Sequence, residues 1–165
     1  MDPSPPNCDY ETYTINVSSN VSTDNSTFKT LIVTPLKDVV EFSLIACSLP
    51  DTTSNVVYIS VNEIDSGFND YSQPAPTTSS PPPNLRKCMG AVYRTFSGAT
   101  ADNRIVYRNE YPIKTRIIYP LERLSNLTIS LFDDTGAPIP TTTPGYYTFQ
   151  IKCLRKNLCN FNICN

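Results

Sequence analysis

The sequence predicts an all-β protein, and three observations support this class. Apolar and polar residues alternate in several short runs, and a period of two is typical of half-buried strands. The 165 residues include 15 prolines and only 5 glycines, with many Thr, Ser and Asn, which favours short strands and long proline-bearing loops over helices. No segment keeps the 3.6-residue apolar spacing of a helix long enough to predict one. The length is that of about one domain.

The clearest strand signals lie in the stretch 111–153. Three runs are predicted there: 113–119, 127–132 and 146–153. Pro120 is expected to end the first run, because proline cannot donate a hydrogen bond to a sheet ladder. The sequence Asp133-Asp134-Thr135-Gly136 follows the second run and predicts a turn. The stretch therefore indicates antiparallel strands joined by turns.

The rest of the chain adds six strand-like runs. The run 28–33 stands before Pro35, and 39–49 is the most apolar of all. In order, the six are 10–17, 28–33, 39–49, 55–64, 87–96 and 103–107. Eight or nine antiparallel strands without helices fit a sandwich, and the jelly roll is the leading eight-stranded form. We therefore predict a single eight-stranded antiparallel jelly-roll sandwich over residues 10–155.

Three segments are predicted to lie outside the packed domain. Residues 1–9 form a proline-rich arm that is expected to be mobile. Residues 72–84 hold five prolines and no charge, so they are expected to be an exposed, polyproline-like loop. Residues 156–165 form a tail that contains cysteine. The N-terminal residues have neither the basic region nor the apolar core of a signal peptide, and no run reaches the roughly 18 apolar residues of a membrane span, so we expect synthesis in the cytosol and no direct membrane insertion.

The six cysteines predict no metal centre. The chain contains no His and no Cys-x-x-Cys spacing, so a zinc site is not expected. Cys47 lies in the apolar run FSLIACSL and is predicted to be a buried free thiol. The candidate disulfide cysteines are structural or intermolecular, with the pairing left open: Cys8, Cys153, Cys159 and Cys164.

The charges are unevenly distributed although the net charge is only −2. Residues 1–71 carry a net −8 and residues 86–123 a net +5. This asymmetry suits copies that associate side by side, one acidic edge against the next basic edge, although solvated strand faces explain the charges equally well. The candidate inter-subunit residues are Arg86, Lys87, Arg94, Arg104, Arg108 and Arg116. Because the basic residues are dispersed, nucleic-acid binding is not expected.

Enzymatic patterns are absent from the sequence. Without His, the Ser and Cys residues lack the usual base of a catalytic triad. The triplet Asp134-Thr135-Gly136 resembles an aspartic-protease loop, but no second such triplet follows and a plain turn is favoured. Sequons such as Asn126-Leu127-Thr128 are expected by chance in a chain rich in Asn, Ser and Thr. No glycine-rich phosphate loop occurs, so we predict a non-enzymatic protein without cofactors.

Two stretches resemble capsid proteins of large icosahedral double-stranded DNA viruses. The first is VEFSLIACSLPDTTSNV with the following VYISVNEID, and the second is YPLERLSNLTISLFDDTGAPI leading to YTFQIKCL. Among these proteins, the single jelly-roll penton proteins of the nucleocytoplasmic type are the most similar in length, over about residues 36–155. The motifs are mostly apolar patterns. The tail cysteines and the proline-rich loop have no counterpart in the resemblance.

The resemblance implies a structural virion protein. Such a penton protein forms a homopentamer at each fivefold vertex and contacts the double jelly-roll major capsid protein and minor capsid proteins. It has no catalytic residues, and it is made and assembled in the host cytoplasm. Alternatives are a minor capsid or cement protein, a receptor- or glycan-binding jelly-roll module, and a trimeric ligand of the tumour-necrosis-factor type.

Overall fold

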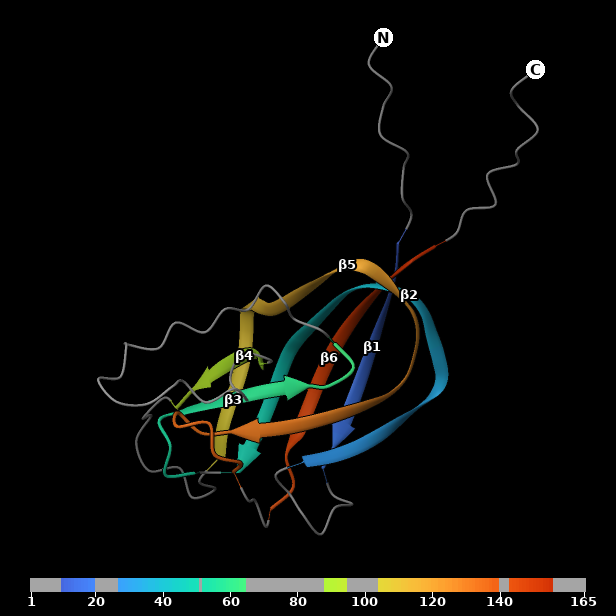
Figure 1. The fold of residues 1–165 in the computed structure, drawn as a ribbon. Coiled ribbons are helices and arrows are strands. Elements are labelled where there is room, and N and C mark those ends of the chain that lie inside the picture. Colours follow the sequence, from blue (N-terminus) through green and yellow to red (C-terminus); the bar gives the residue numbers. More distant parts are fainter. Residues whose placement is uncertain are drawn as a thin grey trace, which may run out of the picture.

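The computed structural model describes residues 10–19, 27–50, 52–64, 88–94, 104–139 and 143–155. Within these ranges the chain forms strands and no helix, which confirms the predicted all-β class. The strands are β1 (Tyr10–Ser18), β2 (Thr27–Pro50), β3 (Val56–Val61), β4 (Cys88–Tyr93), β5 (Arg104–Phe132) and β6 (Tyr146–Leu154) (Figure 1). The predicted arm 1–9, loop 72–84 and tail 156–165 lie outside the described residues.

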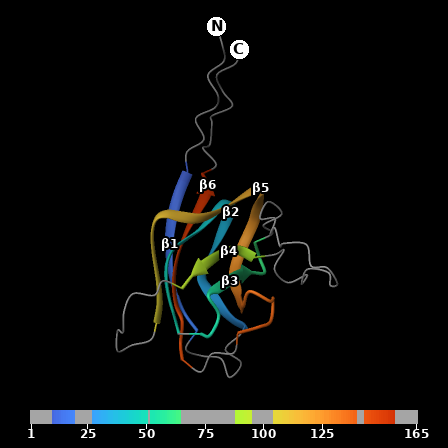
Figure 2. The ribbon, with the colours of Figure 1, turned by 90° about the vertical axis from the view of Figure 1, so that its left-hand side faces the viewer.

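All six strands pair antiparallel in one sheet, in the order β1-β6-β2-β5-β3-β4. The two longest strands, β2 and β5, pair with each other from the Thr27–Ser130 pair to the Pro50–Arg104 pair. Figures 1 and 2 show both strands curving round, so that their first and second halves lie on opposite sides of the fold. The sheet therefore curls over on itself and encloses a core.

The described residues form six strands where eight or nine runs were predicted, because neighbouring runs join. The runs 28–33 and 39–49 are both part of β2. The described part of the run 103–107, which begins at Arg104, is part of β5, as are the runs 113–119 and 127–132. Pro35 and Pro120 lie at register shifts, where residues of β2 or β5 have no partner in the β2–β5 ladder. A proline at such a bulge costs no ladder hydrogen bond, so the chain bends there instead of ending its strand. Asp38, with φ of 52°, lies in the same curved part of β2.

The core contains buried side chains from all six strands, most of them from β2, β5 and β6. In β6 the buried residues are Tyr147, Phe149, Ile151 and Cys153, and they alternate with more exposed residues. Phe149 packs against Phe42 of β2, with ring centroids 4.9 Å apart. The run 39–49 supplies several fully buried side chains, which agrees with its place as the most apolar run. Leu127, Ile129 and Leu131 of β5 are buried as well.

The segment after β5 is a turn stabilised by one aspartate. The Asp133 carboxylate accepts hydrogen bonds from the backbone N–H groups of Thr135 and Ala137, each at 2.9 Å. Gly136 follows with φ of 81°, a left-handed conformation that glycine adopts without strain. The predicted turn at Asp133-Asp134-Thr135-Gly136 is confirmed. After this turn the chain returns as β6, which lies between β1 and β2 in the sheet.

Candidate binding groove

A groove of about 940 Å³ runs along one side of the curled sheet. Its walls are residues 11 and 13–16 of β1, 31–38 of β2 and 153–155 at the end of β6 and just beyond it. The walls meet here because β6 pairs with β1 on one side and with β2 on the other, but only from Val39 onward along β2. The earlier part of β2 curves away from β1 and leaves the space between them. We call this space the β1–β2 groove.

The backbone edges at the groove are incompletely paired. In the described part of the chain, β1 pairs only with β6, and residues 27–37 of β2 pair only with β5. Such edges present backbone N–H and C=O groups to any extended segment that lies beside them. The β1–β2 groove therefore combines a hollow with strand edges that can accept a further strand.

The floor of the groove is apolar. Ile15 and Ile32 are half-buried and pack against the core, and Leu36 is only 6% exposed. At the β2 wall, Leu31 and Val33 are 76% and 98% exposed, which is unusual for neighbouring large apolar residues. Burying them would remove apolar surface from water, and that burial is favourable in proportion to the area.

The opposite side of the fold is closed. There β4, in one half of the curl, lies against β5 in the other half. An added Cβ at Gly90 would collide with the Ile113 side chain, so only glycine permits this close approach. The two sides of the sheet therefore differ: the β1–β2 side has a groove, and on the other side β4 lies close against β5.

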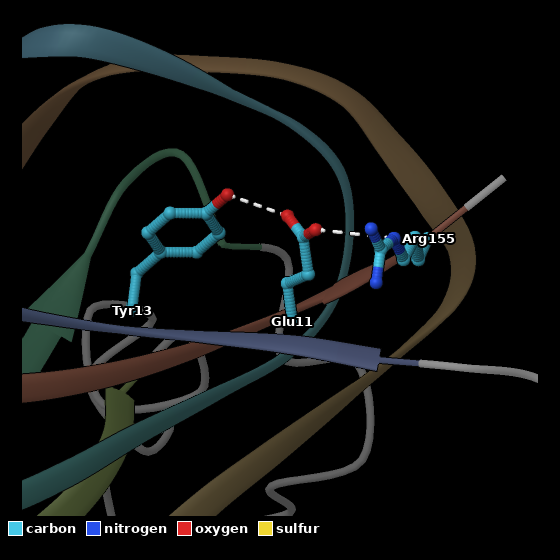
Figure 3. A network of polar contacts seen from close by, with 3 residues as sticks. All are labelled: Glu11, Tyr13 and Arg155. Atoms are coloured by element: carbon cyan, nitrogen blue, oxygen red, sulfur yellow. Dashed lines mark hydrogen bonds and ion pairs between the residues drawn. The ribbon is translucent and has the colours of Figure 1, made fainter.

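A polar network lies at the end of the groove where the strands β1 and β6 meet (Figure 3). The Tyr13 hydroxyl donates a hydrogen bond to Glu11 Oε2 at 2.7 Å, and Arg155 Nε lies 3.4 Å from Glu11 Oε1. The hydrogen bond to the Glu11 carboxylate raises the pKa of Tyr13, because ionised tyrosine cannot donate. The network links the start of β1 to the residue at which the chain leaves β6.

The groove is suited to binding and not to nucleophilic chemistry. Its thiol is Cys153, which is 5% exposed, and burial raises its pKa above the ordinary value, with Glu11 and Asp38 adding to the effect. A thiol of this kind stays protonated near neutral pH and is a poor nucleophile. Among the described residues, no group of three or more His, Cys, Asp and Glu side chains is arranged to hold a metal ion.

The described cysteines are buried thiols outside any disulfide. Cys47 is 4% exposed, which confirms the predicted buried thiol. Burial raises the pKa of Cys47 to about 12 and that of Cys88 to about 11. Cys153 is also a thiol here. Its candidate partners Cys8, Cys159 and Cys164 lie outside the described residues, so their pairing stays a prediction.

We expect the three buried thiols to resist alkylation in the folded protein. Brief treatment with iodoacetamide near neutral pH should leave Cys47, Cys88 and Cys153 unlabelled, because each thiol is shielded and protonated. The same treatment in urea should label all three. Peptide mapping by mass spectrometry measures both states, and rapid labelling of native Cys47 would contradict its burial.

The candidate inter-subunit residues fall into three groups. Arg86 and Lys87 lie outside the described residues. Arg94 is half-buried after β4, where its backbone N–H donates to Asn55 O at 2.9 Å. Arg108 and Arg116 are exposed on β5 and form no ion pair within the described part of the chain. Of the described candidates, Arg108 and Arg116 are therefore the two that are exposed charges on the first half of β5.

Arg104 is engaged inside its own chain. Its Nε donates to Ser48 Oγ at 2.7 Å, and its Nη2 donates to the carbonyl oxygens of Ser48 and Pro144 at 2.9 and 2.8 Å. Its guanidinium also lies over the Tyr146 ring, 5.4 Å from the centroid. Arg104 therefore fastens the end of β2 to the segment that leads into β6.

Arg104→Lys is expected to lower the free energy of unfolding by about 1–2 kcal/mol, since a single ammonium cannot replace the fork of the guanidinium across these acceptors. Urea unfolding measures the loss. Arg108→Lys, on the same strand with an exposed side chain, is the control and should change stability little. Equal effects of the two variants would contradict the anchoring role.

The described residues show only part of the predicted excess of acidic residues in the range 1–71. Four of the acids in residues 1–71 are described, namely Glu11, Asp38, Glu41 and Glu63. Glu11 interacts with Tyr13 and Arg155, and Glu41 lies 3.9 Å from Lys114. These acids therefore serve contacts within the chain, and the predicted acidic edge rests on residues outside the described ranges.

Sequence reasoning missed the role of Glu63. Its carboxylate accepts hydrogen bonds from Thr128 N and Thr128 Oγ1, each at 2.7 Å, and from the Asn126 side chain. The sequon Asn126-Leu127-Thr128 is thus held within β5 by an acid that follows β3. A period-two pattern shows that residues 126 and 128 share a face, but it does not show which distant acid lies opposite.

Comparison with known proteins identifies no family for this chain. No protein-family model matches it, and a search of curated proteins finds no significant match. In the described residues, no helix is long and apolar enough to span a membrane. The functional argument therefore rests on the sequence and on the geometry of the curled sheet.

Proposed function

We propose that the curled sheet is a jelly roll and that the chain is a structural protein of a virus particle. The observation that carries the proposal is the nested pairing of the strands. β1 pairs with β6, the first half of β2 with the second half of β5, the second half of β2 with the first half of β5, and β3 with β4. If each bend in β2 and β5 is taken as a boundary, eight segments result, paired from the outside of the sequence inward. This is the strand pattern expected of two Greek keys in a jelly roll.

The proposed assembly is a homopentamer at the fivefold vertex of the capsid. A ring needs two different surfaces on each copy, because its contacts are heterologous. The half of the sheet formed by β1, β6, β2 and β5 has β1 at one edge and residues 104–116 of β5 at the other. The β5 edge carries exposed Arg108 and Arg116, whereas the β1 edge borders the groove. These different edges supply the two surfaces.

The proposed partners follow from the resemblance to penton proteins. The ring would contact the double jelly-roll major capsid protein and minor capsid proteins at the vertex, in virions assembled in the host cytoplasm. The protein would act without cofactor, nucleic acid or membrane insertion. Its role would be to close the shell where five capsid faces meet.

Native mass spectrometry of the purified full chain tests the assembly. We expect five copies, and we expect Arg116→Glu to weaken the pentamer strongly because it places an acid on the basic edge. Arg123→Glu, with the same charge change at an exposed position near the β5 bend, is the control. A trimer would contradict the proposal. If the chain alone is a monomer, the same variants are compared for incorporation into particles with the major capsid protein, and normal incorporation of Arg116→Glu would contradict the edge contact.

The β1–β2 groove favours one alternative, a receptor- or glycan-binding module of the same fold. Ligand sites are hollows with an apolar lining and a few convergent polar groups, and this groove has both, with Glu11, Tyr13 and Arg155 at one end. Binding of the isolated protein to a glycan array, lost in Tyr13→Ala, would support that alternative over a vertex role.

A further inference from the structure

One half of the curl has a column of positive charge on its outer face. This half consists of β1, β6, residues 39–50 of β2 and residues 104–117 of β5. In this part of β5, four side chains are buried or pack against the core: Tyr107, Ile113, Thr115 and Ile117. Successive side chains of a strand point to opposite faces. The exposed residues next to these four therefore point outward, namely Arg108, Lys114 and Arg116.

A fourth cation lies beside this column. In the β2–β5 ladder, the three cations of β5 are opposite residues 46, 43 and 41 of β2. These positions of β2 span at most about 17–18 Å, so the column occupies a small part of the face. Lys152 of β6 pairs with residue 41 from the other side and thus lies in the same row as Arg116. Both neighbours of Lys152 in the sequence are buried, so its side chain also points outward.

The negative charge on this face is small. Glu41 is the one acid that the described residues place there, and its carboxylate lies 3.9 Å from Lys114 Nζ. The Glu41 side chain is 18% exposed, whereas that of Lys114 is 51% exposed. The other outward residues of β1 and β6 are mostly neutral and polar: Thr12, Thr14, Asn16, Thr148 and Gln150. The described part of this face therefore exposes a net positive charge.

Two exposed side chains with apolar surface lie at one end of the column. Tyr146 and Val106 are each 51% exposed. They pair with Ser48 of β2 from opposite sides, so they occupy one row, next to the row of Arg108. Tyrosine and arginine are enriched at the centres of protein interfaces. The face thus combines cations with an apolar end, as protein-binding surfaces do.

The distribution of charge limits the kind of partner. A second copy would bring an equally basic face against this one, and like charges repel. A uniformly charged polyanion would pair with the cations, but it would leave Tyr146 and Val106 in water. A protein surface can pair with the cations and cover these two side chains as well.

We propose that this outer face docks a partner protein that presents a row of carboxylates next to an apolar side chain. We call it the basic face, formed by Val106, Arg108, Lys114, Arg116, Tyr146 and Lys152. The carboxylates lie against the cations of β5 and β6, and the apolar side chain covers Val106 and Tyr146. The inference goes beyond the vertex role and does not depend on it.

A synthetic peptide serves as the probe for this chemistry. Fluorescein is attached to a 12-residue peptide in which Glu alternates with Thr and the last two residues are Phe and Leu. In an extended peptide, alternate side chains repeat at about 6.6–6.8 Å, as Lys114 and Arg116 do along β5. Fluorescence anisotropy with the full chain and reductant should show at least about tenfold tighter binding than for the same peptide with Gln in place of Glu, and salt should reduce the difference. Equal affinities, or no binding of either peptide, would overturn the proposal.

Two pairs of lysines supply matched variants. Lys114→Gln combined with Lys152→Gln should weaken binding of the Glu peptide by at least about fivefold. Lys29→Gln combined with Lys37→Gln makes the same change at exposed positions in the earlier part of β2 and should have little effect. Glu41→Gln removes the acid of the face and should tighten binding by about twofold, a gain that misfolding cannot produce. Equal losses in the two lysine double variants would mean unspecific attraction and would overturn the assignment to this face.

The apolar end separates a protein partner from a polyanion. Val106→Ser should weaken binding of the Glu peptide severalfold and leave binding of heparin unchanged. Val33→Ser is the control, because Val33 is 98% exposed on the earlier part of β2. If Val106→Ser leaves peptide binding unchanged, the protein partner is overturned, and heparin binding that is lost in the Lys114 and Lys152 double variant would assign the face to a polyanion. Native mass spectrometry of each variant shows whether the pentamer has changed, so a failure of the ring and a failure of docking are told apart.

Discussion

Phe149→Ala is expected to cost about 3–5 kcal/mol of the free energy of unfolding. Phe149 is fully buried on β6, 4.9 Å from the Phe42 ring and stacked on Tyr147 at 6.0 Å. β6 lies between β1 and β2 in the sheet. The substitution would therefore leave a cavity, in place of the phenyl ring, beside the central strand of these three. Since small domains are stable by only about 5–15 kcal/mol, the loss would be a large share of the total.

Urea unfolding followed by circular dichroism measures this loss. Phe149→Leu should cost less than Phe149→Ala, because a branched aliphatic side chain fills part of the space. Tyr119→Ala is the control for removing an aromatic ring, since Tyr119 is 83% exposed, and it should stay within about 0.5 kcal/mol of the parent. Equal losses in Phe149→Ala and Tyr119→Ala would contradict the placement of β6 in the core.

The alternation of side chains along the second half of β5 made its buried face predictable. Leu127, Ile129 and Leu131 follow a period of two, and all three are buried in the folded protein. The same reasoning located the turn at Asp133, where turn-forming residues stand together. Local signals therefore gave most of the strands and their inner faces.

The joining of strands was not predictable from local signals. Pro35 and Pro120 usually mark the end of a strand, but here each lies in a bulge that the partner strand tolerates. Whether a proline ends a strand or bends it depends on the residues opposite, which are about 90 positions away in sequence for Pro35. The β1–β2 groove escaped sequence reasoning for the same reason, because it results from the divergence of β1 from the part of β2 that precedes Val39.

The stability of the fold is expected to fall steeply as the pH rises from 9 to 12. Burial raises the pKa of Cys47 from 9.0 to about 12, so the folded state holds this proton in a pH range where the unfolded chain releases it. A raised pKa in the folded state stabilises the protein fully below the unfolded value and is lost above it. Three pH units correspond to roughly 4 kcal/mol for this one thiol.

The contribution of Cys47 can be isolated from the slope of the free energy of unfolding against pH. Cys47→Ala should reduce the decline of the free energy of unfolding with pH by about 1.4 kcal/mol per pH unit between pH 9 and 12. Part of the decline should remain, because burial also raises the pKa of Cys88 to about 11 and that of Tyr147 above its ordinary value. Urea unfolding at a series of pH values with reductant provides the measurement. Identical slopes in the parent and in Cys47→Ala would mean that this thiol is open to solvent in the folded protein, and the core formed by the second half of β2 would then be wrong.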